Sequence, residues 1–231
     1  MTIVGVDESG RISFRVYLDH GADPAGLAHD RGFAVVRPLD AVRDQTGDLV
    51  LTMSVRPLGG EPRPPVRGRR PDRSLVHTDD LAPLVRQRVA AYAVVLSTRG
   101  LLATQFSART AVPGRWGMPG GGLDDHEQPG AAVFREVVEE TSQAIVLGDL
   151  ARVHTSHWIG RNPQGTIEDF HAVRLVYRGR CEAPTDPVVL DTDGTTRSAR
   201  WVALDSWWKV HWTPNWRDVL SELLTQRTQR R

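Results

Sequence analysis

Apolar and polar residues alternate in two short runs near the start of the chain. RISFRVYL, residues 11–18, and DLVLTMSVRPL, residues 48–58, place an apolar side chain at every second position, which is the period of a half-buried β-strand. Between them, DPAGLAHD predicts a short helix over residues 23–30. We therefore expect residues 1–58 to form a small β-rich module with one helix, whose role no motif identifies.

Glycine, proline and arginine dominate the stretch that follows this module. Residues 59–73, GGEPRPPVRGRRPDR, carry five arginines and a single large apolar residue, Val66, a composition typical of linkers. Arginines also bind phosphate or RNA, but no aromatic residues are interleaved here for base stacking. We predict a Pro/Gly/Arg-rich linker over residues 59–78.

The pattern after residue 78 indicates strands and helices in alternation. LAPLVRQRV predicts a short helix over residues 81–89. Strands are predicted at residues 91–97, 100–107, 151–159, 171–180 and 199–204. The last segment, TPNWRDVLSELLTQR, predicts a helix with Thr213 as its cap and Pro214 in its first turn. Residues 79–231 are therefore expected to form an α/β domain with a mixed sheet and an apolar helix stripe of Trp216, Val219, Leu220, Leu223 and Leu224.

A helix predicted to begin at Gln128–Gly130 carries three glutamates on one side. Glu136, Glu139 and Glu140 follow the spacing i, i+3 and i+4, so their carboxylates share one face and repel one another. The stripe that recurs at core spacing consists of Ala131, Phe134, Val138 and Thr141, which puts the glutamates away from the predicted buried face. Hard divalent ions such as Mg²⁺ and Mn²⁺ prefer clustered oxygen donors of this kind.

The composition of the whole chain excludes several classes of protein. Its 231 residues include 29 basic and 28 acidic ones, for a net charge of +1, so no overall field favours nucleic acid. The single cysteine, Cys181, excludes an internal disulfide and a four-cysteine zinc site. Asp7 and Glu8 precede any apolar run, and no stretch approaches the roughly 18 apolar residues that span a bilayer. We therefore expect a cytoplasmic protein without a signal peptide.

The stretch from Gly121 to Glu140 resembles the Nudix box, G-x5-E-x7-R-E-U-x-E-E-x-G-U, in which U is a bulky aliphatic residue. Its fixed positions are occupied by Gly121, Glu127, Arg135, Glu136, Val137, Glu139 and Glu140. RWGMPGG, residues 115–121, resembles the segment that leads into the box. Two positions depart from the pattern, since Ser142 replaces the closing glycine and Gln143 the last aliphatic residue. A serine forced into the left-handed conformation of that glycine costs roughly 1 kcal/mol.

This resemblance to the Nudix hydrolase superfamily implies an α/β/α sandwich and the hydrolysis of a diphosphate linkage, in a nucleoside triphosphate or another nucleotide derivative. By position, the implied ligands of Mg²⁺ or Mn²⁺ are Glu136, Glu139, Glu140 and the backbone carbonyl of Gly120. Glu127 and Arg135 complete the implied catalytic set and are expected to brace the loop and orient the carboxylates. The metal ions would neutralise the diphosphate oxygens and acidify the attacking water.

Several functional alternatives stay open at this point. A Nudix-like module that senses a nucleotide fits the altered end of the box and the unassigned residues 1–58. An isomerase acting on a prenyl diphosphate, one branch of the superfamily, normally has a catalytic cysteine near the strand that leads into the box, whereas Cys181 lies well past it. The general base is either a box glutamate or Glu168, which begins a strand beside Asp169. The substrate class ranges over nucleoside triphosphates, nucleotide sugars and modified nucleotides.

Histidines and tryptophans offer weaker signals. His154 and His157 have an odd spacing that puts them on opposite faces of a regular strand, and no third histidine or cysteine stands nearby in the sequence. We interpret both as ordinary strand residues. All seven tryptophans follow residue 115, and most are expected to pack in the core or at a domain or dimer interface, so a homodimer is a predicted assembly. Membrane and nucleic-acid partners are not expected.

Overall fold

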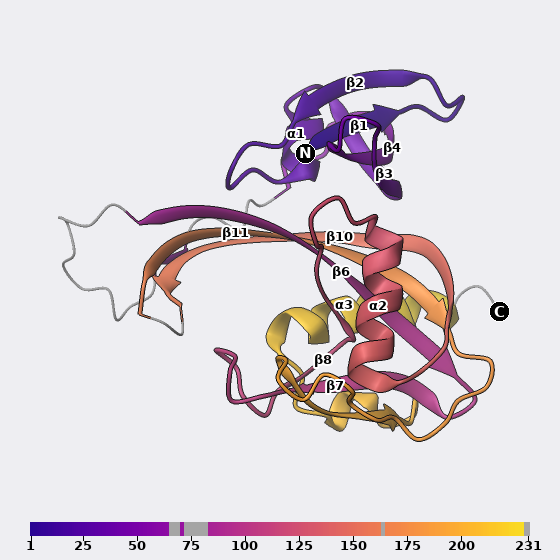
Figure 1. The fold of residues 1–231 in the computed structure, drawn as a ribbon. Helices are drawn as coiled ribbons and strands as arrows, with labels where there is room; N and C mark the ends of the chain where they lie inside the picture. Colours follow the sequence, from indigo (N-terminus) through magenta and orange to yellow (C-terminus); the bar gives the residue numbers. More distant parts are fainter. Residues whose placement is uncertain (65–69, 72–82, 163–164, 229–231) are drawn as a thin grey trace. The chain divides into compact units, whose positions relative to one another are not determined.

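The computed structural model describes residues 1–64, 70–71, 83–162 and 165–228 of the chain (Figure 1). By their contacts the residues divide into two units. The first unit comprises Met1–Ala90, Gly122–Pro129 and Asp149–Leu175, and the second comprises Ala91–Gly121, Gly130–Gly148 and Val176–Arg231. Most of the predicted linker lies outside the described residues. The domain boundaries drawn from the sequence at residues 58 and 78 stay a prediction.

A four-stranded mixed sheet forms the beginning of the first unit. Its strands are β1 (Thr2–Val6), β2 (Ile12–Tyr17), β3 (Phe33–Arg43) and β4 (Leu49–Pro57), in the order β2-β1-β4-β3. β1 pairs parallel with β4, whereas β2 and β3 pair antiparallel with their neighbours. Because apolar residues alternate along β4, one face of the sheet is buried, and its core includes Ile3, Leu51, Met53 and Val55. The β-rich N-terminal part expected from the sequence is confirmed.

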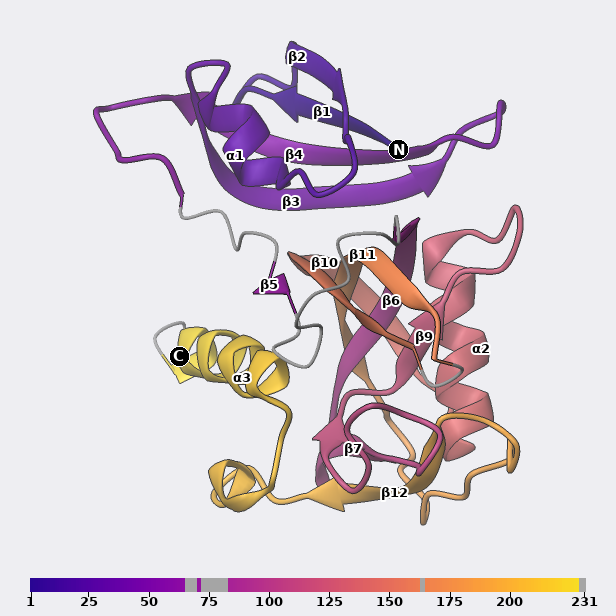
Figure 2. The same cartoon turned by 90° about the vertical axis from the view of Figure 1, so that its left-hand side faces the viewer.

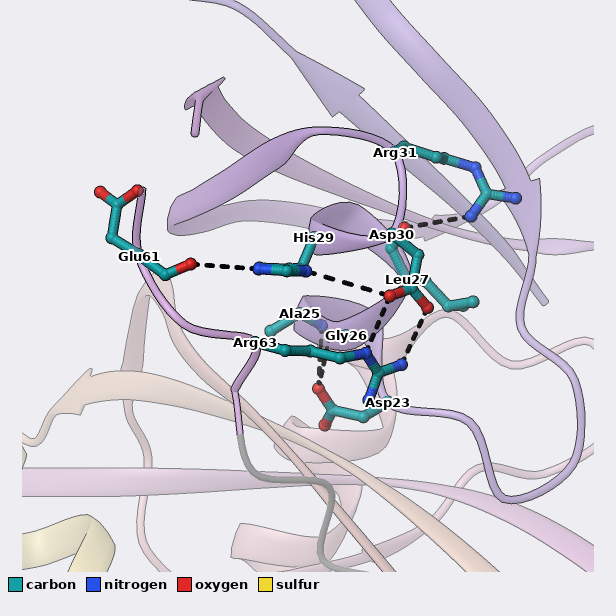
Figure 3. Close-up of polar contacts among 9 residues, drawn as sticks. All are labelled: Asp23, Ala25, Gly26, Leu27, His29, Asp30, Arg31, Glu61 and Arg63. Carbon is teal, nitrogen blue, oxygen red and sulfur yellow. Dashed lines mark hydrogen bonds and ion pairs between the residues drawn. The ribbon is translucent and has the colours of Figure 1, made fainter. Parts of the chain in front are cut away.

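The short helix α1 (Pro24–His29) is capped at its start and held near its end. Asp23 Oδ1 accepts hydrogen bonds from two backbone N–H groups of the first turn at 3.0 and 3.1 Å, which satisfies donors that have no partner inside a helix. Just past the helix, Asp30 accepts two hydrogen bonds of 2.8 Å from the guanidinium of Arg63 (Figure 3). The described start of the predicted linker therefore folds back against α1.

The second sheet has eight strands. Its main path is β12-β7-β6-β11-β10-β5, with β8 beside β7 and β9 beside β6. The bounds are β5 (Arg70–Pro71), β6 (Leu84–Ser97), β7 (Gly100–Phe106), β8 (Trp116–Gly117), β9 (Gly120–Gly122), β10 (Val146–Arg161), β11 (Ile167–Arg180) and β12 (Thr196–Val202). β6 and β7 pair antiparallel, whereas β10 pairs parallel with β5, so the sheet is mixed. The other predicted strands are confirmed within longer or shifted bounds.

The helix predicted over residues 81–89 is wrong where the structure describes it. Residues from Leu84 onward are extended and continue into the strand that buries Ala91, Ala93 and Val95. The carbonyl oxygen of Val89 accepts a hydrogen bond from a backbone N–H beyond β9. A partner that lies far away in the sequence therefore decides the conformation, and it overrides the local helical pattern.

Helices α2 (Pro129–Thr141) and α3 (Pro214–Thr228) lie on opposite sides of β6 and β7 (Figure 2). A 3₁₀ turn, η1 (Trp207–Lys209), precedes α3. The hydroxyl of Thr213 accepts a hydrogen bond from the N–H of Trp216 at 3.4 Å, as a cap does. The ring of Trp216 packs on Tyr92 of β6 with the ring centroids 5.0 Å apart. The predicted α/β sandwich and its C-terminal helix are confirmed. Among the described residues, no helix is long and apolar enough to cross a membrane.

Candidate functional site

Two glycines at the start of β9 allow a close approach of backbone and side chain. Gly120 has a φ of 142°, and a Cβ atom there would collide with the carbonyl oxygen of Ala91 on β6. At Gly121, a Cβ atom would collide with the carboxylate of Glu136 on α2. The first position therefore needs glycine for its backbone, and the second needs glycine because a glutamate occupies the adjacent space.

Arg135 links two of the three glutamates of α2. Its Nη1 donates to Glu136 Oε1 at 2.9 Å and to Glu139 Oε2 at 3.2 Å. The side chains of Glu136 and Glu139 are 16% and 41% exposed, so the two carboxylates reach solvent to different degrees. The guanidinium offsets part of their repulsion and fixes their orientation.

Glu140 is the buried glutamate of the group, since only 7% of the residue is exposed. Its Oε2 accepts a hydrogen bond from the backbone N–H of Gly120 at 3.0 Å, and its Oε1 accepts one from the hydroxyl of Thr196. Burial raises the pKa of Glu140 to about 7, and the neighbouring charges of Glu136 and Glu139 add to this rise, whereas the two hydrogen bonds oppose it. Glu140 therefore places a carboxyl group where water has little access, next to two more exposed glutamates.

The buried face of α2 differs from the face predicted from the sequence. Phe134 and Val138 are 44% and 46% exposed. The buried residues are Pro129, Ala132, Val133, Val137, Glu140 and Thr141. The prediction that the glutamates point away from the buried face is therefore wrong for Glu140. The apolar residues of this helix form two possible buried stripes, one through Phe134 and Val138 and one through Val133 and Val137. The structure buries the second stripe, on the side where Glu140 contacts Gly120 and Thr196.

Ser142, which replaces the closing glycine of the box, takes the left-handed conformation of that glycine. Its φ is 55°, and its N–H donates to the carbonyl oxygen of Val138 at 2.8 Å. The hydroxyl donates to the carbonyl oxygen of Thr141 at 2.7 Å and accepts a hydrogen bond from the N–H of Val188 at 3.2 Å. These two bonds offset the strain of a left-handed serine, so α2 ends where a glycine would end it.

Gln143 replaces the last aliphatic residue of the box and is satisfied as a buried amide. The residue is 2% exposed. Its Nε2 donates to Thr141 O at 3.1 Å and to Thr185 Oγ1 at 2.9 Å, and its Oε1 accepts from the N–H of Thr185 at 3.0 Å. Neither departure from the box pattern therefore disrupts the end of the helix.

Glu127 and Glu168 belong to the first unit. Glu127 closes the turn before α2, because its Oε2 accepts from the N–H of Asp124 at 2.9 Å while its own N–H donates to Asp124 O at 3.1 Å. Glu168 is 8% exposed, and its Oε1 accepts a hydrogen bond from Asn162 Nδ2 at 3.1 Å. Its role as general base stays a prediction.

Sequence reasoning missed two groups of polar residues. The first is Thr196, whose hydroxyl contacts Glu140 from β12 and which no local pattern distinguishes from its neighbours. The second involves His157, interpreted from the sequence as an ordinary strand residue. Its Nε2 lies 2.5 Å from Asp169 Oδ1, and a third residue, His20, contacts the same oxygen at 3.0 Å. The missing third histidine comes from the loop before α1, far away in the sequence.

Of the seven tryptophans, only Trp212 and Trp216 are buried in the core, at 2% and 6% exposed. The core packing expected for most of them is therefore found for two, and packing at an interface stays a prediction. Trp116 lies beneath the guanidinium of Arg200, 4.2 Å from its ring centroid, and thereby anchors the loop before β9. Trp208 is 50% exposed.

The residues of the glutamate site fit a hard divalent ion. Glu136, Glu139 and Glu140 supply oxygen donors alone, which Mg²⁺ and Mn²⁺ prefer. Burial is the main cause of the raised pKa of Glu140, and repulsion from the charges of Glu136 and Glu139 adds to it. A cation bound to them would relieve that repulsion.

A comparison with protein-family models places most of this chain in a known family. The model described as the NUDIX domain matches residues 86–223. The match covers more than half of the chain, and the protein therefore belongs to the NUDIX domain family. At the level of this family, the protein is a hydrolase acting on diphosphate linkages.

Solved structures include similar chains. One is a MutT protein from Methanosarcina mazei Go1, with 20% identity, coverage of 64% of this chain and 99% of that chain, and a TM-score of 0.47. Another is a MutT NUDIX hydrolase from Burkholderia pseudomallei, with 27% identity, coverage of 59% and 97%, and a TM-score of 0.41. A NUDIX hydrolase from Nitrosomonas europaea has 23% identity, coverage of 61% and 90%, and a TM-score of 0.47. No curated protein matches the sequence.

Proposed function

We propose that the protein is a Mg²⁺- or Mn²⁺-dependent hydrolase that cleaves a diphosphate linkage in a nucleoside triphosphate or another nucleotide derivative. The observation that carries this proposal is the environment of Glu140. Its carboxylate is buried, has a pKa raised to about 7, and adjoins Glu136 and Glu139. Three carboxylates held together in this way are poorly stabilised as bare anions, and a divalent ion compensates their charge.

The roles of the surrounding residues follow from their contacts. Arg135 holds Glu136 and Glu139 in a fixed orientation through its Nη1, and Glu127 closes the turn before the helix. Both act as positioning residues, while the three α2 glutamates and the carbonyl of Gly120 hold the ion. When bound, the ion neutralises the diphosphate oxygens and acidifies the attacking water.

The alternative is a catalytically weak module that senses a nucleotide. It was suggested by Ser142 and Gln143, which depart from the box, and by residues 1–58, whose role no motif identifies. Ser142 adopts a φ of 55°, and Gln143 is hydrogen-bonded through both ends of its amide, so neither residue gives a reason for lost activity. Hydrolysis is therefore the better-supported function. A cytoplasmic location, a small-molecule nucleotide substrate and a homodimer stay predictions.

The test is the release of phosphate or pyrophosphate from nucleoside triphosphates, nucleotide sugars and dinucleotides, in the presence of Mg²⁺ or Mn²⁺. Wild type is compared with Glu139→Gln and Glu140→Gln. We expect turnover of at least one substrate class by wild type, and its loss in both variants. Glu182→Gln is the matched control, because Glu182 is exposed and pairs with Arg180 rather than with the site.

Folding of each variant is checked by circular dichroism and by its melting temperature. Turnover that persists in both folded α2 variants contradicts the assignment of the metal ligands. A wild type that turns over no substrate, yet binds nucleotides as tightly as the variants do, supports the sensing module instead.

A further inference from the structure

A second cluster of possible metal ligands lies in the first unit. It is formed by His20 from the loop before α1, His157 from β10 and Asp169 from β11. One donor atom from each residue lies within 4.8 Å of the others. The side chains are 25%, 14% and 13% exposed, respectively. Three residues from distant parts of the sequence therefore bring two imidazoles and a carboxylate together at a partly buried position.

The distances within this cluster suit a small metal ion. Nε2 of His20 and Nε2 of His157 lie 3.0 and 2.5 Å from the same oxygen, Oδ1 of Asp169. Donor atoms around a tetrahedral Zn²⁺ lie about 3.3 Å apart, because its bonds to nitrogen and oxygen are about 2.0–2.1 Å long. The two nitrogens therefore lie within about 1 Å of the spacing that such an ion requires.

The loop that carries His20 is fixed by contacts outside the cluster. Asp23, the cap of α1, uses Oδ2 to accept a hydrogen bond from Thr155 Oγ1 of β10 at 2.7 Å. Gly21 has a φ of 77°, and a Cβ atom there would lie 2.8 Å from atoms of the His157 ring. The glycine thus lets the loop approach the histidine closely. Such supporting contacts hold a ligand set in place before the ion binds.

One imidazole nitrogen of the cluster, Nδ1 of His20, is buried and has no hydrogen-bond partner among the described residues. The ring of His171 lies 5.6 Å from that of His20 and 6.0 Å from that of His157, centroid to centroid. Buried polar atoms are nearly always paired, and exceptions point to a bound ion or water that supplies the partner. Buried imidazole groups beside the three ligands therefore offer hydrogen-bonding atoms to a water molecule bound to the ion.

One of the three residues borders a pocket. His20 lines a cavity of about 490 Å³ together with Leu18, Arg43 and Gln87, whereas His157 and Asp169 do not line it. Three protein ligands leave at least one coordination position for water or an exogenous ligand.

We propose that His20, His157 and Asp169 form a binding site for a divalent transition metal of the Zn²⁺ class. Two of the three donors are imidazoles, which suit Zn²⁺ and Co²⁺, whereas Mg²⁺ prefers oxygen donors alone. The site is therefore chemically distinct from the glutamate site on α2. Its ion pins the loop before α1 to β10 and β11. This proposal does not depend on the proposed hydrolase activity.

The test is Zn²⁺ binding to the full chain, freed of any affinity tag and of metal. Equilibrium dialysis is performed with excess Mg²⁺ present, so that oxygen-only sites are occupied. Wild type is expected to bind one Zn²⁺ per chain and to melt at a higher temperature with Zn²⁺. His157→Gln and Asp169→Asn are each expected to weaken Zn²⁺ binding by at least about tenfold. At a metal site, loss of a residue that only hydrogen-bonds to a ligand already costs about tenfold in affinity, so loss of a ligand should cost no less.

Two control variants distinguish this site from Zn²⁺ bound by a surface histidine or by the α2 glutamates. His211→Gln removes an exposed histidine of the second unit, and Glu139→Gln removes a carboxylate of the glutamate site; both are expected to retain Zn²⁺. Co²⁺ added to wild type should give the visible absorption of a low-symmetry site with nitrogen ligands, a result that does not depend on how a variant folds. Wild type that binds no Zn²⁺, or equal binding by wild type, His157→Gln and Asp169→Asn, overturns the proposal.

Discussion

The carboxylate of Glu140 accepts a hydrogen bond from the backbone N–H of Gly120 at 3.0 Å, twenty positions earlier in the chain. This bond joins the last turn of α2 to β9, where Gly120 adopts a φ of 142°. It also holds a charged group in a position that is 7% exposed. The glutamate therefore connects the geometry of the loop with the electrostatics of the site, and both can be tested.

Glu140→Gln should change how stability depends on pH in metal-free protein. Burial raises the pKa of Glu140 from its usual value of 4.5 to about 7 in the folded state. The protonated form is therefore favoured by folding, so its contribution is full below about pH 4.5 and is lost as pH rises through about 7. The loss amounts to up to about 3 kcal/mol, and the neutral amide does not experience it.

Urea unfolding in EDTA, at about pH 5 and about pH 8, measures this difference. Wild type should lose stability relative to Glu140→Gln between these two values. Parallel pH curves for the two proteins would show that the carboxyl group is not perturbed by burial.

Alanine at the two glycines of β9 should have different effects. Gly120→Ala meets backbone atoms of β6 at a φ of 142°, so it should lower the free energy of unfolding by about 1–3 kcal/mol. Gly121→Ala meets the end of a side chain, Glu136, which can rotate away. It should keep most of the stability and lower kcat at least about tenfold. Melting temperatures and kcat values of both variants test this contrast. Equal losses of stability in the two variants would contradict it.

Substitutions at Ser142 should separate strain from hydrogen bonding. Ser142→Ala keeps the left-handed φ of 55° but removes the bonds to Thr141 and Val188, so it should cost about 1 kcal/mol. Ser142→Gly also removes the bonds but relieves a strain of about 1 kcal/mol, which leaves stability nearly unchanged. Denaturant midpoints decide the order, and an alanine variant as stable as the glycine variant would count against the left-handed conformation.

Thr196→Val should leave Oε1 of Glu140 buried without its hydroxyl donor. An unpaired buried acceptor costs about 1–3 kcal/mol, and the lost hydrogen bond, which lowers the pKa of Glu140, should make that carboxyl harder to ionise. We expect lower stability and weaker activation by Mg²⁺ at neutral pH. Thr196→Ser keeps the hydroxyl and is the matched control. The prediction fails if valine and serine variants require the same Mg²⁺ concentration for half-maximal activity.

Local features of the chain were predictable because their causes are local. The spacing of Glu136, Glu139 and Glu140 on one helix follows from helical periodicity alone. The alternation in β2 and β4 likewise marks half-buried strands. Thr213 and Pro214 identify the start of α3 because capping involves only the neighbouring turn. Each of these predictions depends on residues within a few positions of one another.

Features that depend on distant partners were out of reach. The stretch that begins at Leu84 is extended because its partners lie across the sheet, although its own pattern favours a helix. Phe134 and Val138 are exposed because Gly120 and Thr196 meet the other side of α2. His20 and Asp169 are 149 positions apart in the sequence, and only the fold brings them into contact. A sequence encodes periodicity directly, but burial, pKa and ligand sets arise when the fold brings distant residues to one place.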